Sequence, residues 1–166
     1  MATIILGLDP GTATVGYGVV VSDRSIVKHI AHGCFLTSKD LPMATRLNQI
    51  AKALREVLRQ YTPDIVAIED LFFAKNVTTA ITVAQARGVL IQTVANLNLP
   101  VEHYTPLQVK QALTGYGKAD KPQMQKMVKL LLGLAEIPRP DDAGDALAIA
   151  ITCANSVTLA SLKKQL

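Results

Sequence analysis

The sequence contains no tryptophan, and aromatic residues make up only 4% of its 166 residues. Because 49% of the residues are nevertheless hydrophobic, the core must be built from isoleucine, leucine, valine and alanine, as buried α/β sheets usually are. Two cysteines, Cys34 and Cys153, lack a C-x-x-C spacing, and the three histidines are scattered. This pattern argues against a disulfide framework or a zinc site. The length favours a single domain over residues 1–166.

The sequence also lacks the signals of secretion and of a membrane span. No basic n-region precedes the first apolar run, so no secretory signal is predicted. The apolar stretch from Ala143 to Leu162 contains Asp145, Thr152 and Asn155, which favours a helix facing the core over a transmembrane helix. We therefore expect a cytoplasmic protein that does not associate with membranes.

Acidic residues are scarce only in the middle third of the chain. Seven lysines and arginines lie between residues 71 and 130, against two acids, Glu102 and Asp120. Basic and acidic residues cancel in residues 1–70, where each sign occurs seven times. A localised basic surface favours a phosphate-rich polymer as the partner, although a solvated face would have the same composition.

The hydrophobic pattern predicts three strands first and alternating helices and strands afterwards. The short connections make the first three strands an antiparallel meander, and a right-handed crossover then places the fourth strand beside the first. The expected fold is α/β, a mixed five-stranded sheet with helices on both faces. Strands are predicted at 3–9, 14–21, 26–37, 65–69 and 99–104, and helices at 47–61, 78–97, from 106, at 122–133 and after 140.

Four acidic residues stand at the ends of these predicted elements. Asp9 and Glu69 each close an apolar strand, while Asp142 and Asp145 lie i, i+3 on one face of the last helix. If the helix packs across the two strand ends, the four carboxylates form a site for hard divalent cations such as Mg²⁺. Each acid also has an ordinary explanation, because acids cap helix starts and Asp-Pro-Gly is a turn sequence.

Five sequence blocks carry a more specific signal. Together they closely resemble the RuvC family of bacterial Holliday junction resolvases, in the ribonuclease H-like superfamily, over residues 3 to 155. The resemblance implies a ribonuclease H-like fold and a single RuvC-type nuclease domain. In chain order the blocks are Leu6-Gly7-Leu8-Asp9-Pro10-Gly11, Ala67-Ile68-Glu69-Asp70-Leu71-Phe72 with Ala74-Lys75-Asn76, Gln85-Ala86-Arg87-Gly88-Val89, Gln108-Val109-Lys110-Gln111 and Asp142-Ala143-Gly144-Asp145-Ala146-Leu147-Ala148.

The resemblance implies a metal site and names its ligands. Asp9, Glu69, Asp142 and Asp145 match the acids that bind two Mg²⁺ ions per subunit, for which Mn²⁺ could substitute. Asp141 is adjacent but has no matching position. Asp70 replaces the glutamine expected after the catalytic glutamate, and it adds negative charge beside the metals.

The resemblance and the charge pattern also predict contacts with DNA. Lys110 and Lys121 match basic residues at the scissile region, and Lys121, at an electrostatically poor helix start, is predicted to be catalytic. Phe72 matches an aromatic residue that stacks at the opened crossover, although Phe72 or Phe73 is also expected in the core. The full predicted DNA-contact set is Phe72, Lys75, Arg87, Lys110, Lys118 and Lys121.

Three positions keep more than one interpretation. Arg87 could contact DNA or lie in a subunit interface. Gly16 and Gly18, inside a predicted strand, indicate either a close backbone approach or a bulge. The helix predicted over Thr78–Leu97 is apolar on more than one face, so it is central in the fold or packs against a second subunit.

The predicted function is resolution of four-way DNA junctions in recombination and repair, by paired symmetric nicks and two-metal hydrolysis. The expected partners are the junction, a second copy of the chain, and the RuvA–RuvB branch-migration complex. The alternatives are a ribonuclease H-like nuclease on another nucleic acid, a junction-binding protein without catalysis, and a phosphate-binding lobe of an actin-like ATPase. The last is suggested by Leu8-Asp9-Pro10-Gly11-Thr12 but requires a second lobe.

Overall fold

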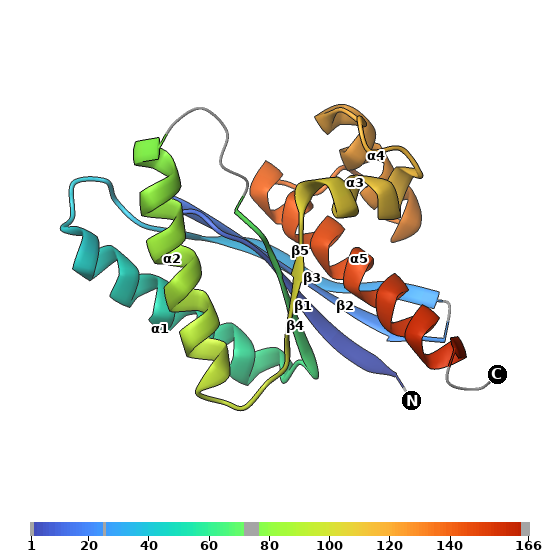
Figure 1. The fold of residues 1–166 in the computed structure, drawn as a ribbon, viewed down its shortest axis with the longest axis horizontal. Helices are drawn as coiled ribbons and strands as arrows, with labels where there is room; N and C mark the ends of the chain where they lie inside the picture. Colours follow the sequence, from blue (N-terminus) through green and yellow to red (C-terminus); the bar gives the residue numbers. More distant parts are fainter. Residues whose placement is uncertain (1, 25, 72–76, 164–166) are drawn as a thin grey trace.

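The structure is a computed structural model that describes residues 2–24, 26–71 and 77–163 (Figure 1). The elements follow one another in the predicted order, with bounds that differ by a few residues. No helix among the described residues is long and apolar enough to cross a bilayer. The elements are β1 (Thr3–Asp9), β2 (Thr14–Asp23), β3 (Ile26–Leu36), α1 (Met43–Tyr61), β4 (Ile65–Glu69), α2 (Val77–Ala95), β5 (Val101–Tyr104), α3 (Pro106–Thr114), α4 (Lys121–Leu131) and α5 (Asp141–Lys163).

The strands form one mixed sheet in the order β3-β2-β1-β4-β5. The first three strands are antiparallel neighbours, whereas β4 runs parallel to β1 and β5 runs parallel to β4. The predicted pairing of the fourth strand with the first is therefore confirmed. Leu8 pairs with Ile68, so the next residues, Asp9 and Glu69, lie side by side where the two strands end.

Helices cover both faces of the sheet, as expected. α1 and α2 lie against one face, and α5 crosses the other with α3 and α4 beside it (Figure 1). Side chains alternate along β1, so Leu6 and Leu8 face α1 and α2 while Ile5 faces α5. The same alternation turns Asp9 toward the face that α5 covers.

The glycines of β1 and β2 let α5 lie directly on the sheet. A Cβ atom at Gly16 would lie 2.0 Å from the carbonyl oxygen of Asp142, and one at Gly7 would lie 2.1 Å from that of Ala146. At Gly18 the nearest atom would be the backbone nitrogen of Leu147, at 2.7 Å. The strand irregularity falls between Val19 and Val20 instead. Close backbone approach is therefore the correct interpretation of Gly16 and Gly18. It lets the first turn of α5 lie close to the sheet.

Candidate active site

Two capping boxes fix the helices that bring lysines to the open edge of the sheet. In α3 the Thr105 hydroxyl accepts a hydrogen bond from the backbone N–H of Gln108, whose side chain bonds back to the Thr105 backbone. In α4 Asp120 and Gln123 make the same reciprocal pair. Such boxes satisfy backbone donors that a helix start leaves unpaired. Lys110 and Lys121 are thus carried by helices with well-defined starts.

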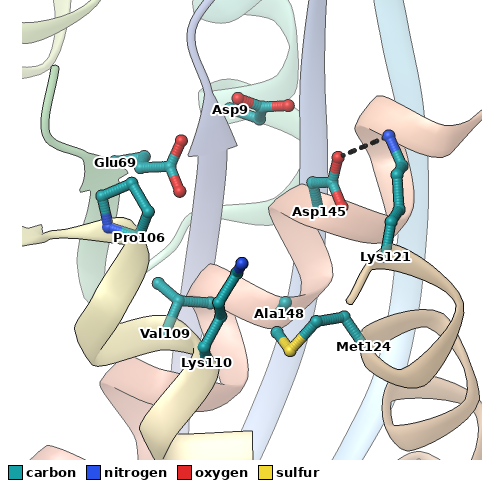
Figure 2. A pocket seen from close by; sticks show the side chains of 9 residues that line it. All are labelled: Asp9, Glu69, Pro106, Val109, Lys110, Lys121, Met124, Asp145 and Ala148. Carbon is teal, nitrogen blue, oxygen red and sulfur yellow. Dashed lines mark hydrogen bonds and ion pairs between the residues drawn. The ribbon is translucent and has the colours of Figure 1, made fainter. Parts of the chain in front are cut away.

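A cavity of about 250 Å³ opens where the ends of β1 and β4 meet α3, α4 and α5. Figure 2 shows Asp9, Glu69 and Asp145 arranged around it, with Lys110 reaching in from α3 and Lys121 standing beside Asp145. Its remaining lining is largely apolar. The lining residues are Asp9, Glu69, Pro106, Val109, Lys110, Lys121, Met124, Asp145 and Ala148.

Asp9 is the most strongly perturbed acid of the site. Burial, followed by the nearby charges of Glu69, Asp145 and Asp142, raises the pKa of its carboxyl to about 8. The charge of Lys121 opposes this shift but does not cancel it. A carboxyl that holds its proton near neutral pH marks a site whose negative charge lacks compensation.

Glu69 shares this electrostatic environment. Burial, followed by repulsion from Asp145 and Asp70, raises its pKa to about 7. The ammonium group of Lys110 acts in the opposite direction, which places Lys110 close enough to influence the site. The edge of the sheet therefore concentrates negative charge in a partly buried cavity.

Lys121 makes ion pairs with two acids at the start of α5. Its Nζ lies 3.2 Å from Oδ2 of Asp145 and 3.5 Å from Oδ2 of Asp141. Burial alone would lower the pKa of Lys121, but the hydrogen bonds and charges of Asp145 and Asp141 outweigh it and the pKa is raised. The pKa of Asp145 is raised by burial, against the opposing effect of Lys121. Lys121, whose side chain is 51% exposed, thus places a cation at this end of the cavity.

The donor set fits a hard divalent cation, although the ligand shell is not closed. The cavity offers carboxylate oxygens from separate elements, and their mutual repulsion would be relieved by a bound cation. Within the described residues no three acidic, histidine or cysteine side chains converge on one point. Asp142 stands beside the cavity, where its charge acts on Asp9 and Asp145.

The other predicted contact residues are distributed unevenly. Phe72 and Lys75 lie outside the described residues. Lys118 is exposed on the connection between α3 and α4. Arg87 is bound to the end of β4, where its Nε donates to the carbonyl oxygen of Glu69 at 3.0 Å.

Asp70 is predicted to add negative charge beside the metals, and in the structure this charge has a partner, Arg87. Side chains alternate along the strand, so Asp70 is directed to the face opposite Glu69, where its carboxylate forms an ion pair with Arg87. Its charge still contributes to raising the pKa of Glu69, after burial and Asp145. The guanidinium of Arg87 therefore lies against the negative charge that Asp70 adds.

Sequence reasoning missed the roles of Asp141 and Arg139. Asp141 pairs with Lys121 and also with Arg139, so a chain of charges leads from the loop before α5 into the site. The i, i+4 spacing of Asp141 and Asp145 could have indicated that one cation would meet both. The apolar lining residues Val109 and Met124 gave no sequence signal, because helix-facing hydrophobic residues are ordinary core positions.

The fold and the site define a nuclease of the ribonuclease H-like class, in which acids from two neighbouring strands and a crossing helix surround one cavity. The profile of the family described as "Crossover junction endodeoxyribonuclease RuvC" matches residues 5–153. The chain belongs to this family.

Individual relatives agree with this assignment. The RuvC protein of Syntrophomonas wolfei is 52% identical over 157 residues, which cover 95% of this chain and 91% of the relative. The structure of Thermus thermophilus RuvC has a TM-score of 0.88 at 36% identity, covering 95% of this chain and 96% of that one. T. thermophilus RuvC in complex with Holliday junction substrate has a TM-score of 0.85 at 34% identity, with the same coverage. The family's description identifies the chain as an endodeoxyribonuclease.

Proposed function

We propose that this protein resolves four-way DNA junctions in recombination and repair, by paired symmetric nicks that hydrolyse phosphodiester bonds. The observation that carries the proposal is one cavity in which Asp9, Glu69 and Asp145 face Lys110 and Lys121. Support for the substrate comes from the similar T. thermophilus RuvC, whose structure was determined with a Holliday junction.

Divalent cations are the cofactors that this acid set suits, and we propose two Mg²⁺ per subunit, replaceable by Mn²⁺. Asp9, Glu69, Asp142 and Asp145 would hold them. When bound, such ions would lower the pKa of an attacking water and neutralise charge at the phosphate and the leaving oxygen. Asp9 stands between the acids of β4 and α5, so it is the best candidate to bridge two ions.

The two lysines contribute in different ways. Lys121 is held by Asp145 and Asp141, so its ammonium is oriented at the cavity before any substrate arrives. A phosphate group entering there would meet a positioned cation rather than a mobile one, which favours stabilisation of developing charge. Lys110 acts from α3 on the side of Glu69. We assign catalytic charge stabilisation to Lys121 and phosphate contact to both.

The test is incubation with a synthetic mobile four-way junction, with Mg²⁺ and with a chelator. We expect paired nicks at symmetric positions only when Mg²⁺ is present. A linear duplex and an RNA–DNA hybrid of matched sequence serve as controls. Cleavage of the hybrid in preference to the junction would favour the ribonuclease H alternative, and junction binding without any nick would favour a non-catalytic role.

We also predict that the protein forms a homodimer through α2. The core takes Ala86, Leu90 and Val94 of this helix, while Ile81 on another side is 56% exposed. Two symmetric nicks require two related sites, which a twofold dimer supplies. Sedimentation should therefore show a dimer at micromolar concentration, and Ile81→Glu should shift it toward monomer. The matched substitution Ile26→Glu, at an exposed residue of β3, should leave the dimer unchanged. A wild-type protein that sediments only as monomer would contradict the prediction.

The remaining assignments complete the proposal. One nuclease domain spans residues 1–166 and works in the cytoplasm with a RuvA–RuvB branch-migration complex. Phe72 stacks at the crossover, while Lys75 and Lys118 contact the DNA backbone. Support for Lys118 is its exposure beside the helix that carries Lys121.

A further inference from the structure

Arg87 reaches from α2 to the end of the strand that carries Glu69. Its Nε donates to the carbonyl oxygen of Glu69 at 3.0 Å. Its Nη2 donates to the carboxylate of Asp70 and lies 2.8 Å from Nδ1 of His103 on β5. One guanidinium group thus joins three residues at the edge of the sheet, and its side chain is only 19% exposed.

The carbonyl of Glu69 occupies a position where the sheet supplies no backbone donor. The N–H groups of Val66 and Asp70 bond toward β5, to the carbonyls of Pro100 and Tyr104. Strand alternation therefore turns the carbonyl of Glu69 toward β1. The pairing there ends at Ile68, and β1 is followed by Pro10, which has no N–H. Arg87 provides the missing donor from a helix.

We propose that Arg87 is a positioning residue for Glu69, and this inference rests on the proposed function. Its Nε bond fixes the last peptide of β4 and with it the direction from which the Glu69 carboxylate enters the cavity. Asp70 holds the guanidinium from the face opposite the cavity. The planar fork of arginine is needed, because a lysine has one nitrogen and cannot meet the Glu69 carbonyl and Asp70 in the same geometry.

The competing role for Arg87, direct contact with DNA, predicts a different kind of defect. A phosphate contact contributes to junction affinity, and its loss lowers the salt dependence of binding by about one unit of slope. A positioning residue instead affects the turnover of bound junction and the binding of metal, while junction affinity stays nearly constant. The geometry favours positioning, because both identified donor nitrogens already have protein partners.

The experiment compares Arg87→Gln and Arg87→Lys with Asp70→Asn and with Arg55→Gln, an exposed arginine on α1. Three quantities are measured: Mn²⁺ binding by calorimetry without DNA, junction affinity in a chelator at several salt concentrations, and single-turnover cleavage at saturating protein. For Arg87→Gln we expect roughly 10- to 100-fold slower cleavage and weaker Mn²⁺ binding, as for other residues that orient metal ligands. Arg87→Lys should restore little, Asp70→Asn should be milder, and Arg55→Gln should match the wild type.

The results distinguish a positioning role of Arg87 from a DNA contact. Weakened junction binding with a reduced salt slope and a normal cleavage rate at saturation would overturn the proposal in favour of a DNA contact. Wild-type values in all three measurements for Arg87→Gln would overturn it as well. If Arg87→Gln fails to fold, the Arg87→Lys and Asp70→Asn proteins give the same readouts. If the wild type does not cleave junctions, the proposed function fails, while Mn²⁺ binding still reports on Arg87 and Glu69.

Discussion

Replacing Asp9 with asparagine should abolish junction cleavage and leave junction binding nearly intact. In the proposed function, binding depends on the basic surface, whereas cleavage depends on the ions that the carboxylates would hold. Asparagine retains the shape of the side chain and removes its charge, so a carboxylate that would hold the proposed ions is lost at the most buried acid of the site. We expect a rate loss of more than about a thousandfold, or about 4 kcal/mol of transition-state stabilisation. Single-turnover cleavage and gel-shift affinity, measured on the same junction, check the predicted loss of cleavage and the predicted retention of binding.

The same substitution should stabilise the metal-free protein. The pKa of Asp9 is about 8 in the folded protein, against an ordinary value of 3.8. Between these values the folded state holds a proton that the unfolded chain has released, so the stability of the wild type falls as pH rises from about 4 toward 8. Asparagine carries no such cost. We expect Asp9→Asn to gain about 1–2 kcal/mol at pH 8 in a chelator, or roughly 2–8 °C in Tm.

Added Mg²⁺ should make the wild type more stable than Asp9→Asn. The cation must replace the proton on Asp9, so it should raise the Tm of the wild type more at pH 8 than at pH 6 and affect Asp9→Asn much less. Glu56→Gln removes an exposed acid on α1 and is the matched control, which should resemble the wild type in every measurement. Cleavage by Asp9→Asn at the wild-type rate would remove Asp9 from the site. A metal-free wild type whose stability does not fall with pH would contradict the electrostatic account.

The sequence contained enough information to predict the frame of the site. Apolar runs that end in Asp9 and Glu69 defined two strands, and crossover handedness made them neighbours, as the pairing of Leu8 with Ile68 confirms. The i, i+3 spacing of Asp142 and Asp145 put both on one side of the last helix. These inferences succeeded because each depends on local periodicity and on one general rule of connection.

The partners of individual polar side chains could not be predicted in this way. Lys121 is predicted to meet a phosphate because it stands at a helix start, and in the structure it is also paired with Asp145 and Asp141. Arg87 is predicted to contact DNA or a second subunit, and the structure adds a contact that the sequence does not indicate, between its guanidinium and the end of β4. Both contacts depend on how a helix packs against a distant element. The i, i+4 spacing of Asp141 and Asp145 indicates a shared cation, but no local pattern identifies Lys121 as that cation or brings Arg87 to β4.

Replacing Gly16 with alanine should disable the enzyme although no acid is changed. A Cβ atom there would lie 2.0 Å from the carbonyl oxygen of Asp142 and 3.1 Å from the nitrogen of Ala143, so the first turn of α5 must move. That turn carries Asp142 and Asp145, and a displacement of about 1 Å in a catalytic site can cost about 100-fold in rate. We therefore expect cleavage to fall about 100-fold. Overpacking of this kind should also cost about 1–3 kcal/mol of stability.

Gly144→Ala is the matched control, because it adds the same methyl group within the first turn of α5 itself. The nearest atoms to its new Cβ belong to Pro138, at 3.7 and 3.9 Å, which is ordinary contact. Since alanine is the better helix former, Gly144→Ala should retain cleavage and gain up to about 1 kcal/mol. Comparing cleavage by the two proteins separates the effect of displacing α5 from the effect of replacing a glycine with alanine. If Gly16→Ala cleaves as fast as Gly144→Ala, the backbone contact between β2 and α5 does not position the acids.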